Sequence, residues 1–125
     1  MEIVKATAGR DLDAIFVCCG GGGMLAGIAA YVKSVRPDVR VIGVEAEDAA
    51  GMTASLCEGK VVTLNHVGLF ADGAAVRKIG TETFRVCSEL VDEMVTVSTC
   101  DITLRILALE ITSESNLGHY EHRHR

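Results

Sequence analysis

The residues of this 125-residue sequence that point most clearly to chemistry are four consecutive glycines, Gly20–Gly23. They follow a short apolar run, Ala14–Cys18, and precede a stretch in which apolar residues recur with helical spacing. The first N–H groups of a helix lack backbone partners and lie at the positive end of the helix dipole. A loop without side chains at this point therefore favours an anion. The sequence predicts a phosphate site built from backbone amides.

Two kinds of phosphate ligand fit such a loop. The pattern Gly21-x-Gly23-x-x-Ala26 formally matches the fingerprint of dinucleotide-binding folds. Glu45 follows about 20 residues later, where those folds place an acid that binds a ribose hydroxyl. The pattern is short, however, and a run of glycines satisfies it easily. From these residues alone, a dinucleotide and another phosphate ligand remain equally open.

The elements that must position this loop alternate between strand and helix. The run Ala14–Cys18 has no polar alternation, which predicts a strand buried on both faces. A helix should continue from the glycines until Pro37, and the run Val39–Val44 predicts a second strand, parallel to the first. The later segments predict a weak helix at 49–57, an extended piece at 61–64, a loop at 65–73, a helix at 81–90, a strand at 93–97, and a helix from a capping box at Ser98 to Ile111. The fold class is α/β, a parallel sheet with flanking helices.

Length and composition limit the class of protein further. With 49% hydrophobic and 23% charged residues, the chain has globular composition, and its length suits one domain. We place that domain at residues 1–112 and expect a polar, disordered tail at 113–125. The net charge of −5 argues against binding to nucleic acid. No apolar run approaches the ~20 residues of a membrane span, and no targeting segment is visible, so we expect a soluble intracellular protein of unspecified compartment.

Cysteine and histidine residues offer further chemistry, but their spacing does not favour it. The five cysteines form no C-x-x-C pair, and we interpret them as reduced core residues: Cys18, Cys19, Cys57, Cys87 and Cys100. Near the end of the chain, alternate residues could supply metal ligands: His119, Glu121, His122 and His124. No apolar shell would orient these ligands, so we predict no metal site there.

Longer segments resemble a known family. The segment Asp13–Lys33, with the glycines at its centre, resembles the cofactor-phosphate loop and following helix of biosynthetic threonine dehydratase, a pyridoxal-phosphate enzyme of fold type II. Serine dehydratase and serine racemase share the loop and the Ala-Asp-Gly element, whereas Val-Gly-Leu-Phe-Ala-Asp-Gly favours threonine dehydratase. The resemblance spans Leu12–Ile102, and four further segments match in the same order: Ile42–Ala46, Val67–Val76, Ile79–Arg85 and Val91–Val97.

This resemblance implies a partial pyridoxal-phosphate domain of the tryptophan synthase β-like type. The family reaction converts L-threonine to 2-oxobutanoate and ammonia in isoleucine biosynthesis. Glu45 matches an acid that helps to hold a divalent metal in some serine racemases, but Gly51 replaces the second acid, so we predict no metal. The residues implied to bind the cofactor are Gly20, Gly21, Gly22, Gly23 and Met24 around its phosphate, and Gly73 beside its pyridine ring.

The lysine that pyridoxal-phosphate chemistry requires has no counterpart in this sequence. None of the four lysines, Lys5, Lys33, Lys60 and Lys78, stands in the Ser-x-Lys-x-Arg-Gly context of the family. The family's later Pro-Ser-Gly-Ala stretch and its regulatory domain are also absent. We therefore expect a middle piece of an enzyme, inactive alone and without a catalytic residue, whose complete form binds an amino acid and forms a homo-oligomer. The alternatives are a small dinucleotide-binding module and a non-catalytic partner of a full-length homologue.

Overall fold

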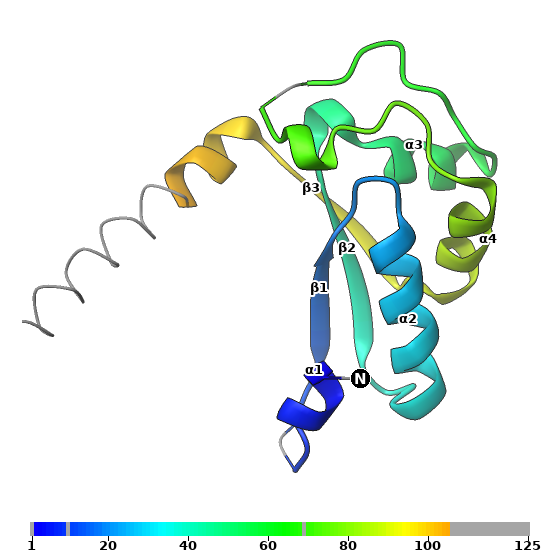
Figure 1. Ribbon diagram of the computed structural model, residues 1–125, viewed down its shortest axis with the longest axis vertical. Helices are drawn as coiled ribbons and strands as arrows, with labels where there is room; N and C mark the ends of the chain where they lie inside the picture. The colour runs from blue at the N-terminus through cyan, green and yellow to red at the C-terminus, as the bar shows by residue number, and fades with distance from the viewer. Residues whose placement is uncertain (1, 10, 69, 106–125) are drawn as a thin grey trace, which may run out of the picture.

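A parallel three-stranded sheet forms the centre of the molecule in a computed structural model that describes residues 2–9, 11–68 and 70–105 (Figure 1). The strands are β1 (Ala14–Cys18), β2 (Arg40–Ala46) and β3 (Glu93–Val97), in the order β1-β2-β3. Both strand pairs are parallel, with Val17 opposite Gly43 and Gly43 opposite Met94. The predicted α/β class and parallel sheet are confirmed, and β1 and β3 have the predicted bounds.

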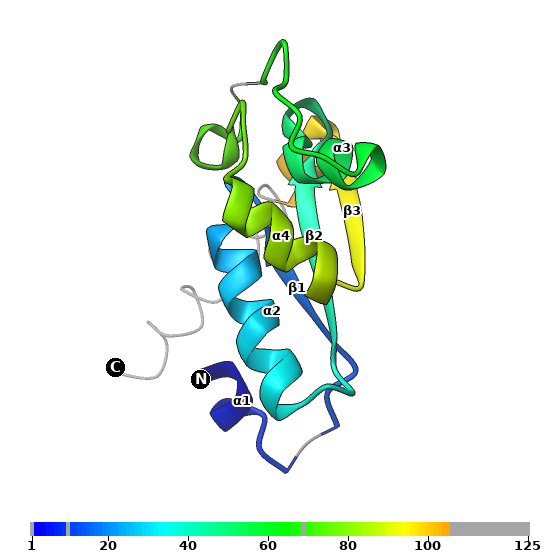
Figure 2. The same cartoon turned by 90° about the vertical axis from the view of Figure 1, so that its right-hand side faces the viewer.

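Two longer helices lie side by side on one face of this sheet, α2 (Gly23–Val35) and α4 (Thr81–Leu90) (Figures 1 and 2). The shorter helix α3 (Gly51–Glu58) follows β2 after the 3-10 turn η1 (Glu47–Ala49). The structure also contains α1 (Glu2–Ala6), which the sequence did not predict, and the 3-10 turn η2 (Asp72–Ala74). Helices α2, α3 and α4 thus coincide with predicted helices, within a few residues at their ends.

Local signals explain where these elements end. Helix α2 stops at Val35, just before Pro37, which cannot continue a helix. Helix α3 ends at Glu58, and the next residue, Gly59, caps it with a φ of 67°, a left-handed conformation suited to glycine. The predicted capping box is present, since the Asp101 N–H donates to Ser98 Oγ (3.2 Å) and the Ser98 N–H donates to the Asp101 carboxylate (3.3 Å). Residues 99–105 are helical, and the rest of that predicted helix lies outside the described residues.

The core lies between the sheet and the two longer helices. Helix α2 contributes Leu25, Ala29 and Val32, which are at most 2% exposed. They belong to the same buried cluster as Val17 and Val41 of the sheet. The apolar stripe read from the sequence is thus the face that α2 buries, and this packing fixes the start of α2 at the end of β1.

The prediction that β1 is buried on both faces is wrong for the described part of the chain. Its side chains alternate, with Val17 buried while Phe16 is 67% exposed and Cys18 is also exposed. The reason is that α2 and α4 lie on the same face, so they cover every second residue of the strand. An uninterrupted apolar run is typical of a strand whose two faces are both packed, whereas the described residues pack on only one face of β1.

The predicted placement of the thiols is correct in part. All five cysteines are free. Cys19 and Cys87 are buried as expected, whereas three others are exposed: Cys18, Cys57 and Cys100. Among the helices of the described ranges, none is long and apolar enough to cross a membrane. The predicted tail at 113–125, with its histidines, lies outside the described residues.

Candidate cofactor site at the glycine loop

The glycine loop, Gly20–Gly23, joins the carboxyl end of β1 to the first turn of α2. On one side it is held by the Cys19 N–H, which donates to the Val44 carbonyl of β2 (2.8 Å). On the other side, the Ala26 N–H donates to the Gly22 carbonyl (2.8 Å) and closes the first helical turn. The N–H groups of residues 23–25 precede that bond and have no acceptor within the helix. This is the arrangement that the sequence predicted for an anion site.

Gly22 marks the packed side of the loop. It is buried, and its φ is 87°, a left-handed value that side chains rarely adopt. A Cβ placed there would stand 2.5 Å from Met52 Cε and 3.3 Å from Thr83 Cβ. Gly22 is therefore required both by the backbone conformation and by the close approach of α3 and α4.

Gly21 and Gly23 mark the open side. Both are exposed, and a Cβ at either position would meet no atom within 4 Å in the described structure. The following residue, Met24, is also 59% exposed. A ligand can therefore approach the backbone amides from this side without displacing a side chain.

The structure also brings the segment of Gly73 to the loop. Gly73 lies in η2, and the next residue, Ala74, packs on the loop: a Cβ at Gly20 would stand 3.1 Å from Ala74 Cα. A Cβ at Gly73 itself would meet nothing within 4 Å. The predicted loop residues and the turn that carries Gly73 are thus neighbours, while the role of Gly73 beside a ring stays a prediction.

Glu45, the penultimate residue of β2, binds the next helix through its carboxylate. Glu45 is only 1% exposed, so its carboxylate lies in the interior. One carboxylate oxygen accepts the Met52 N–H (2.8 Å), and the other accepts the Thr53 N–H (2.9 Å) and hydroxyl (2.7 Å). The carboxylate thus caps the first turn of α3. Because both of its oxygens are occupied in the interior, this geometry opposes the interpretation of Glu45 as a ribose-binding acid.

Two buried thiols lie near this carboxylate. Burial, and secondarily the negative charge of Glu45, raises the pKa of Cys19 to about 12. The same two causes raise the pKa of Cys87, in α4, to about 11. Both thiols are therefore neutral at physiological pH, and a neutral thiol is a poor nucleophile. They act as small apolar residues packed in the core beside the loop.

The lysine of α2, Lys33, is bound far from the glycine loop. Lys33 stands ten residues after Gly23, which is about 15 Å along a helix. Its ammonium donates to the Val39 carbonyl (2.9 Å) and pairs with Asp92 (2.7 Å), at the opposite end of the helix from the glycines. Helix α2 therefore offers an anion at the loop its backbone amides and its dipole, without the ammonium of Lys33.

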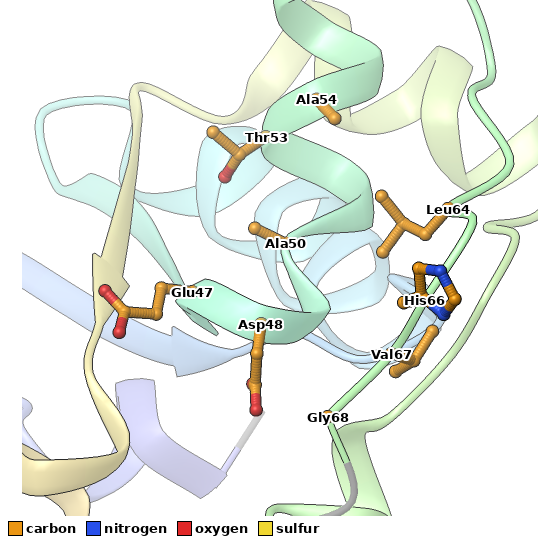
Figure 3. A pocket seen from close by; sticks show the side chains of 9 residues that line it. All are labelled: Glu47, Asp48, Ala50, Thr53, Ala54, Leu64, His66, Val67 and Gly68. Carbon is orange, nitrogen blue, oxygen red and sulfur yellow. The ribbon is translucent and has the colours of Figure 1, made fainter.

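A separate hollow of about 670 Å³ lies between η1–α3 and the segment at 64–68 (Figure 3). Glu47 and Asp48 contribute acidic groups to it, so its charge disfavours a phosphate. None of the predicted cofactor residues lines this hollow. The glycine loop is the better candidate for an anion.

Three residues that the sequence analysis did not single out contact the loop: Met52, Ala74 and Thr83. The Thr83 hydroxyl lies 3.1 Å from the Gly21 carbonyl oxygen and 2.8 Å from the Gly80 carbonyl oxygen, and both are acceptors for its one hydrogen. These residues reach the loop from α3, η2 and α4, which are distant in sequence. No local pattern marks such contacts, because tertiary packing alone creates them.

Comparison with known proteins identifies the family. The model of the pyridoxal-phosphate dependent enzyme family matches residues 1–117 and thus extends past Ile102, where the segment resemblance ended. The chain is 58% identical over 99 residues to L-threonine dehydratase biosynthetic IlvA of Burkholderia multivorans; the match covers 79% of this chain and 19% of that relative. The chain therefore spans about a fifth of the length of this curated relative.

Solved structures give the same result. The processed form of threonine deaminase isoform 2 from Solanum lycopersicum has a TM-score of 0.74 and 46% identity, covering 78% of this chain and 28% of that one. Maize serine racemase has a TM-score of 0.76 and 29% identity, covering 82% and 31%. The predicted resemblance to threonine dehydratases, in a partial chain, is confirmed. With its parallel sheet and its glycine loop at the end of β1, this chain belongs to the pyridoxal-phosphate dependent enzyme family.

Proposed function

We propose that this chain supplies the phosphate-binding half of a pyridoxal-phosphate site in an enzyme of the threonine dehydratase type. The observation that carries the proposal is the open side of the glycine loop at the start of α2. The proposed domain is 1–112, with the tail at 113–125. The proposed cofactor residues are Gly20, Gly21, Gly22, Gly23 and Met24 at the phosphate, and Gly73 beside the pyridine ring.

The loop fits a phosphate group in shape and in charge. The N–H groups at the start of α2 donate hydrogen bonds, and the helix dipole favours the negative charge. The absence of side chains at Gly21 and Gly23 leaves room for phosphate oxygens at the backbone. Gly22 and Gly20 allow the loop to pack against α3, α4 and η2 while it presents that open side.

The loop's task in the complete enzyme is to hold and orient the cofactor. When bound, pyridoxal phosphate supplies an electron sink for charge that develops at the α-carbon of an amino acid. Threonine then loses its α-proton and its β-hydroxyl group as water, and hydrolysis yields 2-oxobutanoate and ammonia. A lysine must move the proton, and we assign this role to no residue of the chain.

Binding measurements test the proposal. Gly21→Ala and Gly23→Ala place a methyl group on the open side, and both should weaken the binding of inorganic phosphate and of pyridoxal phosphate about tenfold, or ~1.4 kcal/mol. Their urea midpoints should not fall, because neither methyl group meets another atom. The matched control is Gly27→Ala, an exposed position within α2 that should leave affinity unchanged. Unchanged affinity in a folded Gly21→Ala variant would refute the loop assignment.

Two further measurements separate the alternatives. The purified chain with added pyridoxal phosphate should form 2-oxobutanoate from threonine no faster than free pyridoxal phosphate does. A chimera that carries the family's missing flanks should gain activity. Turnover by the chain alone would mean that one of its residues replaces the lysine. A saturable fluorescence change with NADH, without binding of pyridoxal phosphate, would favour the dinucleotide alternative.

A further inference from the structure

The Gly21–Gly22 peptide of the glycine loop has little intrinsic reason to keep its orientation. Both of its residues are glycines, which rotate more freely than any other residue. A rotation of this peptide plane would exchange the directions of the Gly21 carbonyl and the Gly22 N–H. The orientation matters because a carbonyl oxygen repels an anion, whereas an N–H group binds it.

A side chain from α4 contacts this peptide. Thr83 lies in the first turn of α4, 62 residues after Gly21, and its hydroxyl oxygen stands 3.1 Å from the Gly21 carbonyl oxygen. The same hydroxyl lies 2.8 Å from the Gly80 carbonyl oxygen. A hydroxyl has one hydrogen, which it donates to one of these two oxygens or shares between them. The Gly80 oxygen already accepts the Phe84 N–H (2.9 Å), so the hydroxyl hydrogen adds most when it is donated to the Gly21 oxygen.

Peptide geometry gives this contact a direction. The carbonyl and the N–H of a trans peptide point to opposite sides, and no cis peptide occurs among the described residues. With the Gly21 oxygen held toward Thr83, the Gly22 N–H points away from α4. The Thr83 Cβ also stands 3.3 Å from the position of a Cβ at Gly22, so its side chain closes the packed side of the loop.

We infer that Thr83 is a positioning residue that locks the Gly21–Gly22 peptide with its N–H directed away from α4, ready to bind a phosphate group. This inference rests on the proposed function, because that function provides the anion. Thr83 itself touches neither phosphate nor substrate; it acts through the Gly21 carbonyl. Loss of the hydroxyl frees the peptide to rotate, and the loop then offers one amide less on average.

Three substitutions isolate the hydroxyl. Thr83→Val keeps the branched shape and removes the donor, whereas Thr83→Ser keeps the donor and removes a methyl group. Thr81→Val makes the same chemical change at an exposed position of the same turn and serves as the control. Urea unfolding of each variant records any general loss of stability, so that it can be separated from changes at the loop.

Two readouts are then compared. In the ligand-free chain, ¹⁵N NMR should show the Gly22 amide signal shifted and more mobile in Thr83→Val, but unchanged in Thr81→Val. In titrations with inorganic phosphate and with pyridoxal phosphate, Thr83→Val should bind about fivefold more weakly, the usual effect of one hydrogen bond. Thr83→Ser should restore binding to within about twofold, because it retains the hydroxyl donor.

The outcomes are distinguishable. If the wild-type chain binds and Thr83→Val binds equally well, the inference is overturned and the proposed function stands. If Thr83→Val and Thr83→Ser lose affinity and stability together, the role of Thr83 is general packing, and the inference is also overturned. If the wild-type chain binds neither phosphate nor pyridoxal phosphate, both the proposed function and this inference fail.

Discussion

Substitution of Gly22 by alanine probes the packed side of the glycine loop. The new methyl group would meet two obstacles, the left-handed backbone at φ 87° and the Met52 side chain, whose Cε lies 2.5 Å from the Cβ position. Thr83 Cβ, at 3.3 Å, limits any movement in the other direction. The methyl group would therefore point into the protein, not toward the open side of the loop, and its main effect should be on stability.

The magnitude follows from these two obstacles. A left-handed conformation costs an alanine about 1–2 kcal/mol relative to glycine. Displacement of the Met52 methyl group adds about 1–3 kcal/mol, the usual cost of overpacking a core. Alanine also reduces the conformational entropy of the unfolded chain, which offsets about 0.4–1 kcal/mol of this loss of stability. The net loss for Gly22→Ala is thus about 3 kcal/mol, within a range of about 1–5 kcal/mol.

Urea unfolding monitored by far-ultraviolet circular dichroism measures this loss. A loss of that size should lower the urea midpoint by roughly 1 M or more, given the usual slope for a small domain. Gly27→Ala is the control, because it places the same methyl group on the exposed face of α2, where it should stabilise the chain by about 0.5–1 kcal/mol. A Gly22→Ala midpoint equal to that of the wild type would refute the packing argument.

Two further substitutions and one chemical modification test other parts of the structure. Asp92 accepts hydrogen bonds from Lys33 and from the Val41 N–H, and these bonds lower the pKa of its carboxyl group. The ionised carboxylate therefore stabilises the fold above the ordinary carboxyl pKa, and this stabilisation is lost as the pH falls. Asp92→Asn should therefore lower the urea midpoint at pH 7 and flatten its decline toward pH 3, near the ordinary carboxyl pKa of about 3.9. Glu45→Ala should cost about 2–3 kcal/mol in thermal unfolding, because it leaves donors of α3 unpaired in the interior; an unchanged melting temperature would contradict the capping role. With a thiol reagent at pH 8, the three exposed cysteines should react quickly, and Cys19 and Cys87 only when the chain unfolds, since burial raises both pKa values.

Elements whose signals are local could be predicted from the sequence. The helix at Thr81–Leu90 and the strand at Glu93–Val97 have the predicted bounds, because periodicity and flanking residues decide both. The location of the glycine loop follows in the same way, from its position between an apolar run and an amphipathic stretch. The exposure of Phe16 could not be predicted, because the sequence of β1 does not show how many layers cover the sheet.

The function of Glu45 shows why a site needs its tertiary neighbours. An acid at the end of a strand fits a ribose-binding residue, a metal ligand and a helix cap equally well. Only the return of the chain into α3, which brings the Met52 and Thr53 N–H groups to the carboxylate, decides between them. That bond also has a consequence for the loop: it fixes the residue whose side chain packs against Gly22. The carboxylate that the sequence offered as one possible ribose ligand therefore supports the glycine loop indirectly, by holding Met52 behind it.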